Sequence, residues 1–239
     1  MDEIAPFIVA PAAPTASRPL TGLTVLVVED SRFACEAMRL LCLRSGARIR
    51  RADCLRSARR HLKVYRPSVA IIDLGLPDGS GADLIRELCE ASPRVAAIFA
   101  TSGDENGEAV ARIAGADGFM PKPITSLALF QNMVLARMPQ DRRPAGLRVV
   151  PDETVVPDPI AYRDDMAHVA EVLGENADDA TLDYIAQFVS GVAHSANDAP
   201  LHNAAKALAR ARSQGRPVAA NTAQIAGLVQ DRLDQKIAM

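Results

Sequence analysis

Strand-like apolar runs alternate with helical patterns along the first 140 residues or so, and this alternation constrains the fold more than any other feature. The helical segments begin a few residues after each run, and both sets recur five times. The expected strands are about 24–29, 47–52, 68–73, 95–101 and 116–120, and the expected helices are about 31–45, 54–65, 80–91, 105–114 and 124–138. Five consecutive strand–helix units predict an α/β fold, with a parallel sheet covered by helices on both faces.

Polar side chains stand at the ends of four of these strands. The first strand ends in Glu29 and Asp30, the third in Asp73 and the fourth in Thr101, while Lys122 follows the fifth. The carboxyl ends of parallel strands meet at one edge of a sheet, where such folds place their ligands. Three carboxylates repel one another unless a cation lies among them, and oxygen donors without nearby Cys or His favour Mg2+. The sequence therefore predicts a magnesium site at this edge.

Together and in this order, these residues resemble the receiver domain of bacterial two-component response regulators, over about residues 22–140. The resemblance implies a doubly wound, flavodoxin-like sheet of five parallel strands. It implies that Asp73 accepts a phosphoryl group from a histidine kinase or a phosphotransfer protein. Glu29, Asp30, Asp73 and the backbone carbonyl of Gly75 would hold Mg2+. Such a protein is a signalling phosphoacceptor rather than an enzyme, apart from self-catalysed phosphoryl transfer and hydrolysis.

The same resemblance gives roles to three further residues. Lys122 would pair with Asp73 and later with a phosphoryl oxygen, and Thr101 would donate its hydroxyl to another oxygen. Phe119 lies three residues before Lys122, where the family carries its switch aromatic. Thr101 and Phe119 would then form the switch that carries phosphorylation to the surface.

The expected helix 124–138 carries two apolar stripes. One stripe, with Leu129, Met133 and Ala136, fits the face toward the sheet. The other lies roughly 145° round the helix, where a surface helix should be polar. A stripe of this kind indicates an interface, either of a homodimer or of intramolecular docking by the C-terminal region. Its members are Leu127, Phe130, Val134 and Met138.

The chain divides by composition into four parts. Residues 1–20, rich in Pro, Ala and Thr, are expected to form a disordered tail before the receiver at 21–139. Five prolines among residues 139–159 indicate a linker at about 140–159. Residues 160–239 contain four apolar stripes with helical spacing, separated by Gly and Pro, and predict a small all-α bundle that serves as the output or interaction domain.

The charges and motifs of the C-terminal region narrow the classes of function that this region could have. Residues 158–239 contain seven basic and eleven acidic residues, whereas a DNA-binding domain needs a basic stripe to neutralise phosphates. This charge balance argues against DNA binding and favours protein–protein interaction as the leading class; a divergent DNA-binding bundle is the alternative. A phosphotransfer-like bundle is the third reading, although the sequences after His168, His194 and His202 lack the expected Lys and Gly.

The rest of the composition agrees with a cytoplasmic protein. The net charge is −2, and the four cysteines show no ligand spacing, which favours reduced core residues. No apolar run reaches membrane-spanning length, and residues 1–20 lack the pattern of a signal peptide. Residues 44–66 hold nine Lys and Arg against Asp53 alone, which indicates a solvated face, or secondarily a surface for an acidic protein.

Overall fold

A parallel five-stranded sheet forms the centre of the larger domain in the computed structural model, which describes residues 13–146, 150, 152–174 and 178–235. The strand order is β2-β1-β3-β6-β7. These strands are β1 (Thr24–Val28), β2 (Arg48–Ala52), β3 (Val69–Asp73), β6 (Ala97–Ser102) and β7 (Gly118–Pro121). The register pairs Asp73 with Thr101, so the ends of β3 and β6 lie side by side. This confirms the predicted sheet.

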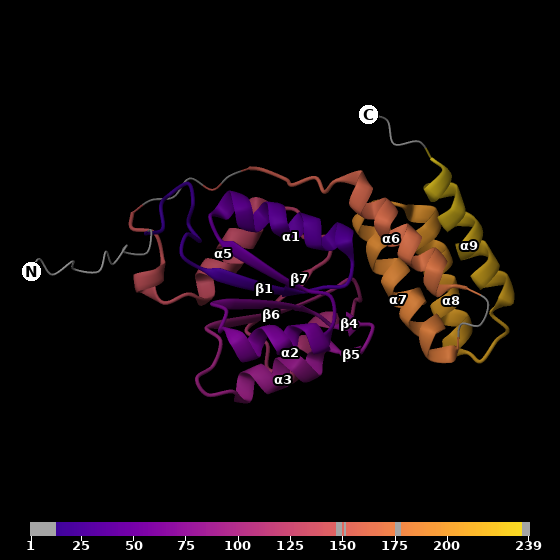
Figure 1. Cartoon of the computed structure of the whole chain (residues 1–239), viewed down its shortest axis with the longest axis horizontal. Helices are drawn as coiled ribbons and strands as arrows, with labels where there is room; N and C mark the ends of the chain where they lie inside the picture. The colour runs from indigo at the N-terminus through magenta and orange to yellow at the C-terminus, as the bar shows by residue number, and fades with distance from the viewer. Residues whose placement is uncertain (1–12, 147–149, 151, 175–177, 236–239) are drawn as a thin grey trace, which may run out of the picture.

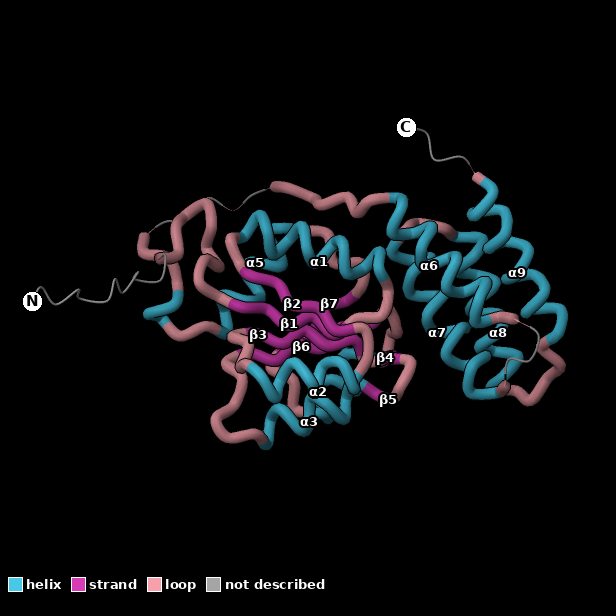
Figure 2. The backbone as a smooth tube through the Cα atoms, viewed as in Figure 1, coloured by secondary structure: helices cyan, strands magenta, loops and turns pink. Residues whose placement is uncertain are grey.

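Helices cover both faces of the sheet (Figure 2). Two of them, α1 (Arg32–Ser45) and α5 (Leu127–Arg137), pack on one face, and three pack on the other: α2 (Leu55–Val64), α3 (Gly81–Glu90) and α4 (Gly107–Ala114). β3 and β6 are buried along their whole length because both faces are covered, which explains their uninterrupted apolar sequences. The doubly wound architecture and the strand order are those of flavodoxin-like folds.

A short antiparallel hairpin, absent from the sequence prediction, follows β3. It consists of β4 (Gly75–Leu76) and β5 (Gly79–Ser80), and it leads directly into α3. Gly81, at the start of α3, lies so close to the backbone carbonyl of Asp73 that any Cβ would collide with it. The absence of a side chain at Gly81 thus lets α3 begin directly beside the end of β3.

The orientation of α5 shows that the predicted interface is wrong. Leu127, Phe130, Val134 and Met138 are all core residues, none more than 3% exposed, whereas Leu129 is 64% exposed. Both stripes are apolar, so the sequence pattern alone did not orient the helix. The stripe with Phe130 and Met138 removes more apolar surface from water than the stripe with Ala136, and it therefore faces the sheet.

Parts of the predicted tail and linker pack on the receiver. Leu20 is fully buried, and Val155 is 1% exposed in the same core as α1 and α5. The backbone of Glu153 and Val155 hydrogen-bonds with Leu127 and Thr125. A 3-10 turn, Gln140–Arg142, precedes this stretch. Most of the predicted tail lies outside the described residues, and the domain boundaries stay a prediction.

The C-terminal region is helical, as predicted. It contains α6 (Pro159–Val172), α7 (Asp179–Ser195), α8 (Ala199–Ser213) and α9 (Ala219–Asp234), which share a separate apolar core. Asp198 connects three of them: its carboxylate caps α8 at Leu201 and accepts hydrogen bonds from Tyr162 and Arg232. No described helix is long and apolar enough to cross a membrane.

The bundle lies beside the receiver at the carboxyl edge of the sheet (Figure 1). α6 and α7 pack against the N-terminal end of α1, and α7 also reaches the hairpin strand β4. The bundle therefore faces the edge where the sequence places its charged residues.

Candidate functional site

Three carboxylates meet at the carboxyl edge of the sheet. Glu29 and Asp30 follow β1, Asp73 ends β3, and each offers an oxygen within 4.8 Å of the others. Glu29 and Asp73 are buried, while Asp30 is half-buried. The strand ends thus bring together the acidic residues that the sequence analysis selected.

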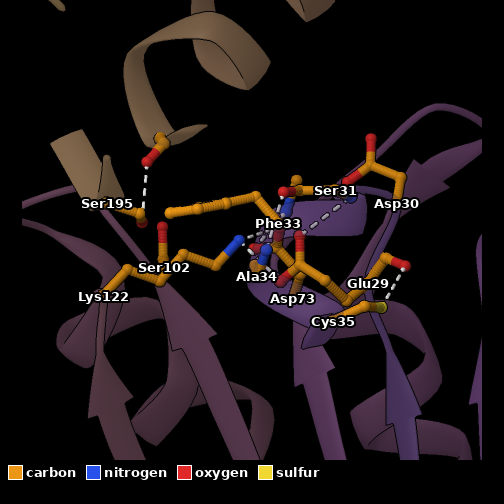
Figure 3. Close-up of polar contacts among 12 residues, drawn as sticks. Glu29, Asp30, Ser31, Phe33, Ala34, Cys35, Asp73, Ser102, Lys122 and Ser195 are labelled. Atoms are coloured by element: carbon orange, nitrogen blue, oxygen red, sulfur yellow. Dashed lines mark hydrogen bonds and ion pairs between the residues drawn. The ribbon is translucent and has the colours of Figure 1, made fainter. Parts of the chain in front are cut away.

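A single lysine lies among these acids. Lys122 follows β7, and its Nζ lies 2.6 Å from Glu29 Oε2 and 2.8 Å from Asp73 Oδ2. Figure 3 shows the Lys122 side chain reaching toward these two carboxylates. Its side chain is 9% exposed, so both ion pairs are screened little by water.

The cluster contains more negative than positive charge, and burial makes this imbalance unfavourable. Burial, together with repulsion from Asp73, raises the pKa of Asp30 to about 7. Burial also raises the pKa of Glu29, against the attraction of Lys122. Burial alone would lower the pKa of Lys122, but the charges of Asp73 and Glu29 outweigh it and raise that pKa. One ammonium balances only one of three carboxylates, so the donor set fits a hard divalent cation.

The remaining predicted residues lie around this cluster. Thr101, paired in register with Asp73, is buried, and its Oγ1 has no hydrogen-bond partner among the described residues. The next residue, Ser102, lines the cavity beside Asp73 and Lys122. The Gly75 amide lies 3.3 Å from Asp73 Oδ1. Phe119 is half-buried on β7, with its ring against Gly107 at the start of α4.

Sequence reasoning missed the residues that the bundle brings to this site. The Tyr184 hydroxyl on α7 donates to Asp30 Oδ2 at 2.8 Å. Gln187, one turn further along α7, occupies the space beside Gly75 that a Cβ would need. Of the three histidines considered, His168 lies near Tyr184, with its Nε2 3.3 Å from the Tyr184 hydroxyl. These pairs are distant in sequence, so no local signal could have found them.

A second contact joins the bundle to the start of α1. Asp165 on α6 is 1% exposed and accepts hydrogen bonds from the Ser31 hydroxyl and the backbone amides of Arg32 and Phe33. The Arg32 side chain also pairs with Asp164 at 2.8 Å. A carboxylate at a helix N-terminus satisfies free amides and interacts favourably with the helix dipole.

An open cavity of about 820 Å3 lies between the receiver site and the bundle. Asp73, Lys122 and Ser102 line it on the receiver side, and Gln187, Lys206 and Arg210 line it on the bundle side. The cavity leads to the acidic cluster from the side of the loop between β6 and α4.

Residues 25–134 match the response regulator receiver domain family. This part of the chain is therefore a receiver domain of the two-component class. The bundle lies beyond the matched segment.

Curated relatives agree with this assignment over the receiver. The chain is 32% identical over 99 residues to the KDP operon transcriptional regulatory protein KdpE of Escherichia coli, covering 41% of this chain and 44% of that protein. It is 31% identical over 102 residues to the virulence transcriptional regulatory protein PhoP of Salmonella typhimurium, covering 42% and 46%. The chain thus spans less than half the length of these relatives.

Solved receiver structures are also similar. The signal receiver domain of a histidine kinase from Syntrophus aciditrophicus is 24% identical, with 50% of this chain and 94% of that chain covered and a TM-score of 0.44. A CheY-like receiver domain from Methylobacillus flagellatus is 24% identical, with 48% and 98% covered and a TM-score of 0.44.

Proposed function

We propose that this protein is the response regulator of a phosphorelay, in which Asp73 accepts a phosphoryl group from a phosphohistidine. The observation that carries the proposal is the buried cluster at the carboxyl edge of a receiver domain, where Lys122 pairs with Asp73 at 2.8 Å. In the transfer, the Asp73 carboxylate attacks phosphorus, the phosphorus–nitrogen bond of the donor breaks, and an acyl phosphate forms.

Mg2+ is the proposed cofactor, held by Glu29, Asp30, Asp73 and the carbonyl of Gly75. When bound, the ion neutralises charge so that an anionic acceptor and an anionic donor can approach each other. Lys122 would hold Asp73 before transfer and a phosphoryl oxygen afterwards. Thr101 has a buried hydroxyl without a partner, and it would donate to another phosphoryl oxygen.

The proposed consequence is a change in the association of the receiver with the C-terminal bundle. The bundle contacts the site directly through Tyr184 and Asp30, so a change in charge at Asp73 acts within a few side chains of the contact. Phe119 and Thr101 are the proposed switch pair. The proposed partner is a histidine kinase or a phosphotransfer protein in the cytoplasm.

The names of the relatives support one alternative, a DNA-binding output. Both KdpE and PhoP are named transcriptional regulatory proteins. α8 carries three basic residues, Lys206, Arg210 and Arg212. Arg212 is neutralised, however, because it pairs with Asp179 and Asp183. A gel-shift series in increasing salt separates the readings, since DNA binding falls steeply as salt rises.

Phosphorylation by acetyl phosphate with Mg2+ tests the main proposal. Intact-mass spectrometry should detect one added phosphoryl group on the wild-type protein and none on Asp73→Asn. Asp83→Asn is a suitable control, because Asp83 is an exposed carboxylate on α3 that pairs with Arg86 and is not part of the cluster. Labelling of Asp73→Asn at the wild-type level would refute Asp73 as the acceptor.

A further inference from the structure

One face of α7 contacts two of the residues proposed to bind the metal ion. Tyr184 and Gln187 are three residues apart, so their side chains project from the same face of the helix. Tyr184 donates its hydroxyl to Asp30 Oδ2 at 2.8 Å, and Gln187 packs against Gly75. The bundle therefore contacts both Asp30, which follows β1, and Gly75, which follows β3.

The Tyr184 contact is a strong one for a neutral donor. Hydrogen bonds to charged groups are stronger than neutral ones, and partial burial removes competing water. A phenol is protonated at neutral pH, so Tyr184 is the donor in this hydrogen bond and Asp30 Oδ2 is the acceptor. A cation bound at Asp30 would draw negative charge from the carboxylate and weaken this hydrogen bond, and the hydrogen bond in turn reduces the charge that Asp30 offers to a cation.

Asp165 strengthens the same docked arrangement from a second helix. Its three hydrogen bonds go to Ser31, Arg32 and Phe33, the residues that directly follow Asp30. The segment that positions the acidic pair is therefore held by α6, while Asp30 itself is held by α7. Docking of the bundle and the geometry of the acidic cluster are thus coupled through adjacent residues.

We propose that the C-terminal bundle is an internal antagonist of metal loading: the docked Tyr184 hydroxyl occupies Asp30, so bundle docking and divalent-cation binding oppose each other. This inference rests on the proposed function for the location of the metal site, but it assigns the regulation to residues outside the receiver. Linkage makes the effect reciprocal: docking weakens cation binding, and cation binding weakens docking, by the same factor.

The first test measures Mg2+ affinity by calorimetry on the full-length chain, without any phosphodonor. Tyr184→Phe removes only the hydroxyl and should bind Mg2+ about tenfold more tightly than wild type, the factor that one hydrogen bond to a carboxylate corresponds to. Tyr162→Phe is the matched control: it removes a bundle hydroxyl from a carboxylate, Asp198, that is not part of the cluster. Its Mg2+ affinity should equal that of wild type.

The second test reads docking directly. Hydrogen exchange of the Arg32 and Phe33 amides, which donate to Asp165, should accelerate when Mg2+ is added to the wild-type protein. Asp165→Ala should show fast exchange with or without Mg2+, together with tighter Mg2+ binding. Circular dichroism of each variant confirms that the helices are retained.

The outcomes separate this inference from the proposed metal site. Asp30→Asn should abolish Mg2+ binding; if it does, and Tyr184→Phe binds Mg2+ like wild type, the metal site stands and the antagonism is refuted. Amide exchange at residues 32–33 that is unaffected by saturating Mg2+ would refute it as well. If Asp30→Asn binds Mg2+ normally, the proposed site itself is wrong, and the inference falls with it.

Discussion

Lys122 acts as a fixed cation inside the acidic cluster, and its removal has a consequence that can be calculated. The Lys122→Met variant keeps a long apolar side chain but leaves Glu29 and Asp73 without their ammonium partner, which lies 2.6 and 2.8 Å away in the wild-type protein. Because both carboxylates are less than a tenth exposed, water replaces little of the lost interaction. Breaking a buried ion pair in this way costs about 3–5 kcal/mol.

Proton uptake sets an upper limit on the cost for each carboxylate. An ordinary Glu has a pKa of about 4.3, so protonating one at pH 7 costs roughly 3–4 kcal/mol, and at pH 5 only about 1 kcal/mol. The variant should therefore lose up to about 3–4 kcal/mol of unfolding free energy for each affected carboxylate at pH 7, and up to about 1 kcal/mol at pH 5.

The direction in which pH changes the unfolding free energy of the variant follows from the number of protons that the folded and unfolded states bind. In the variant, a carboxyl group of the folded protein has a raised pKa, so the folded state binds more protons than the unfolded state above pH ~4.3. The unfolding free energy must then fall as pH rises, until the pH exceeds the folded pKa. Added Mg2+ should recover part of the loss at pH 7, because a ligand that binds only the folded state stabilises it.

Urea unfolding followed by circular dichroism, in EDTA and then in Mg2+, measures these differences. Lys206→Met is the control, because the Lys206 ammonium is exposed and lies 3.9 Å from exposed Glu105, where an ion pair contributes little. A loss below 1 kcal/mol for Lys122→Met at pH 7, or a loss independent of pH, would refute the account of Lys122 as the balancing charge.

Two further predictions concern the packing of α5 and the hydrogen bonds of Asp198 in the bundle. Phe130→Ala should lower the unfolding free energy measured in urea by about 3–5 kcal/mol, and Leu129→Ala by less than about 1 kcal/mol, because only Phe130 is buried. A larger loss for Leu129→Ala than for Phe130→Ala would contradict the orientation of α5. Burial opposes the effect of Arg232 and Tyr162 at Asp198, but these partners lower its pKa overall. The bundle should therefore keep this stabilisation above about pH 4 and lose it as pH falls further, and thermal unfolding of Asp198→Asn should depend less on pH in that range; an equal dependence would contradict this role.

The acidic site could be predicted from the sequence because the topology of a parallel sheet, and not nearness in the chain, brings its residues together. Parallel strands bring their carboxyl ends to one edge whatever separates them, so Glu29, Asp30, Asp73 and Lys122 could be grouped from their positions after apolar runs. The helices of the bundle could likewise be assigned from apolar spacing, since each amphipathic period is local.

The orientation of α5, in contrast, could not be predicted from its apolar spacing. Two apolar stripes on one helix allow two packing solutions with the same period, and the prediction that the Leu129 stripe faces the sheet is wrong. Only the fit of Phe130 and Val134 against α1 and the sheet decides between them, because burial energy depends on the surface that a side chain contacts.

By itself, the amino-acid sequence determined the alternating α/β domain, its acidic edge and the presence of a helical C-terminal region. Tertiary structure alone decided that the bundle docks on that edge, through Tyr184 on Asp30 and Asp165 on the start of α1. The physical reason is that strand and helix periods are local properties of the chain, whereas these hydrogen bonds join residues more than 130 positions apart. Such contacts depend on how two finished surfaces fit together, and no periodicity encodes that fit.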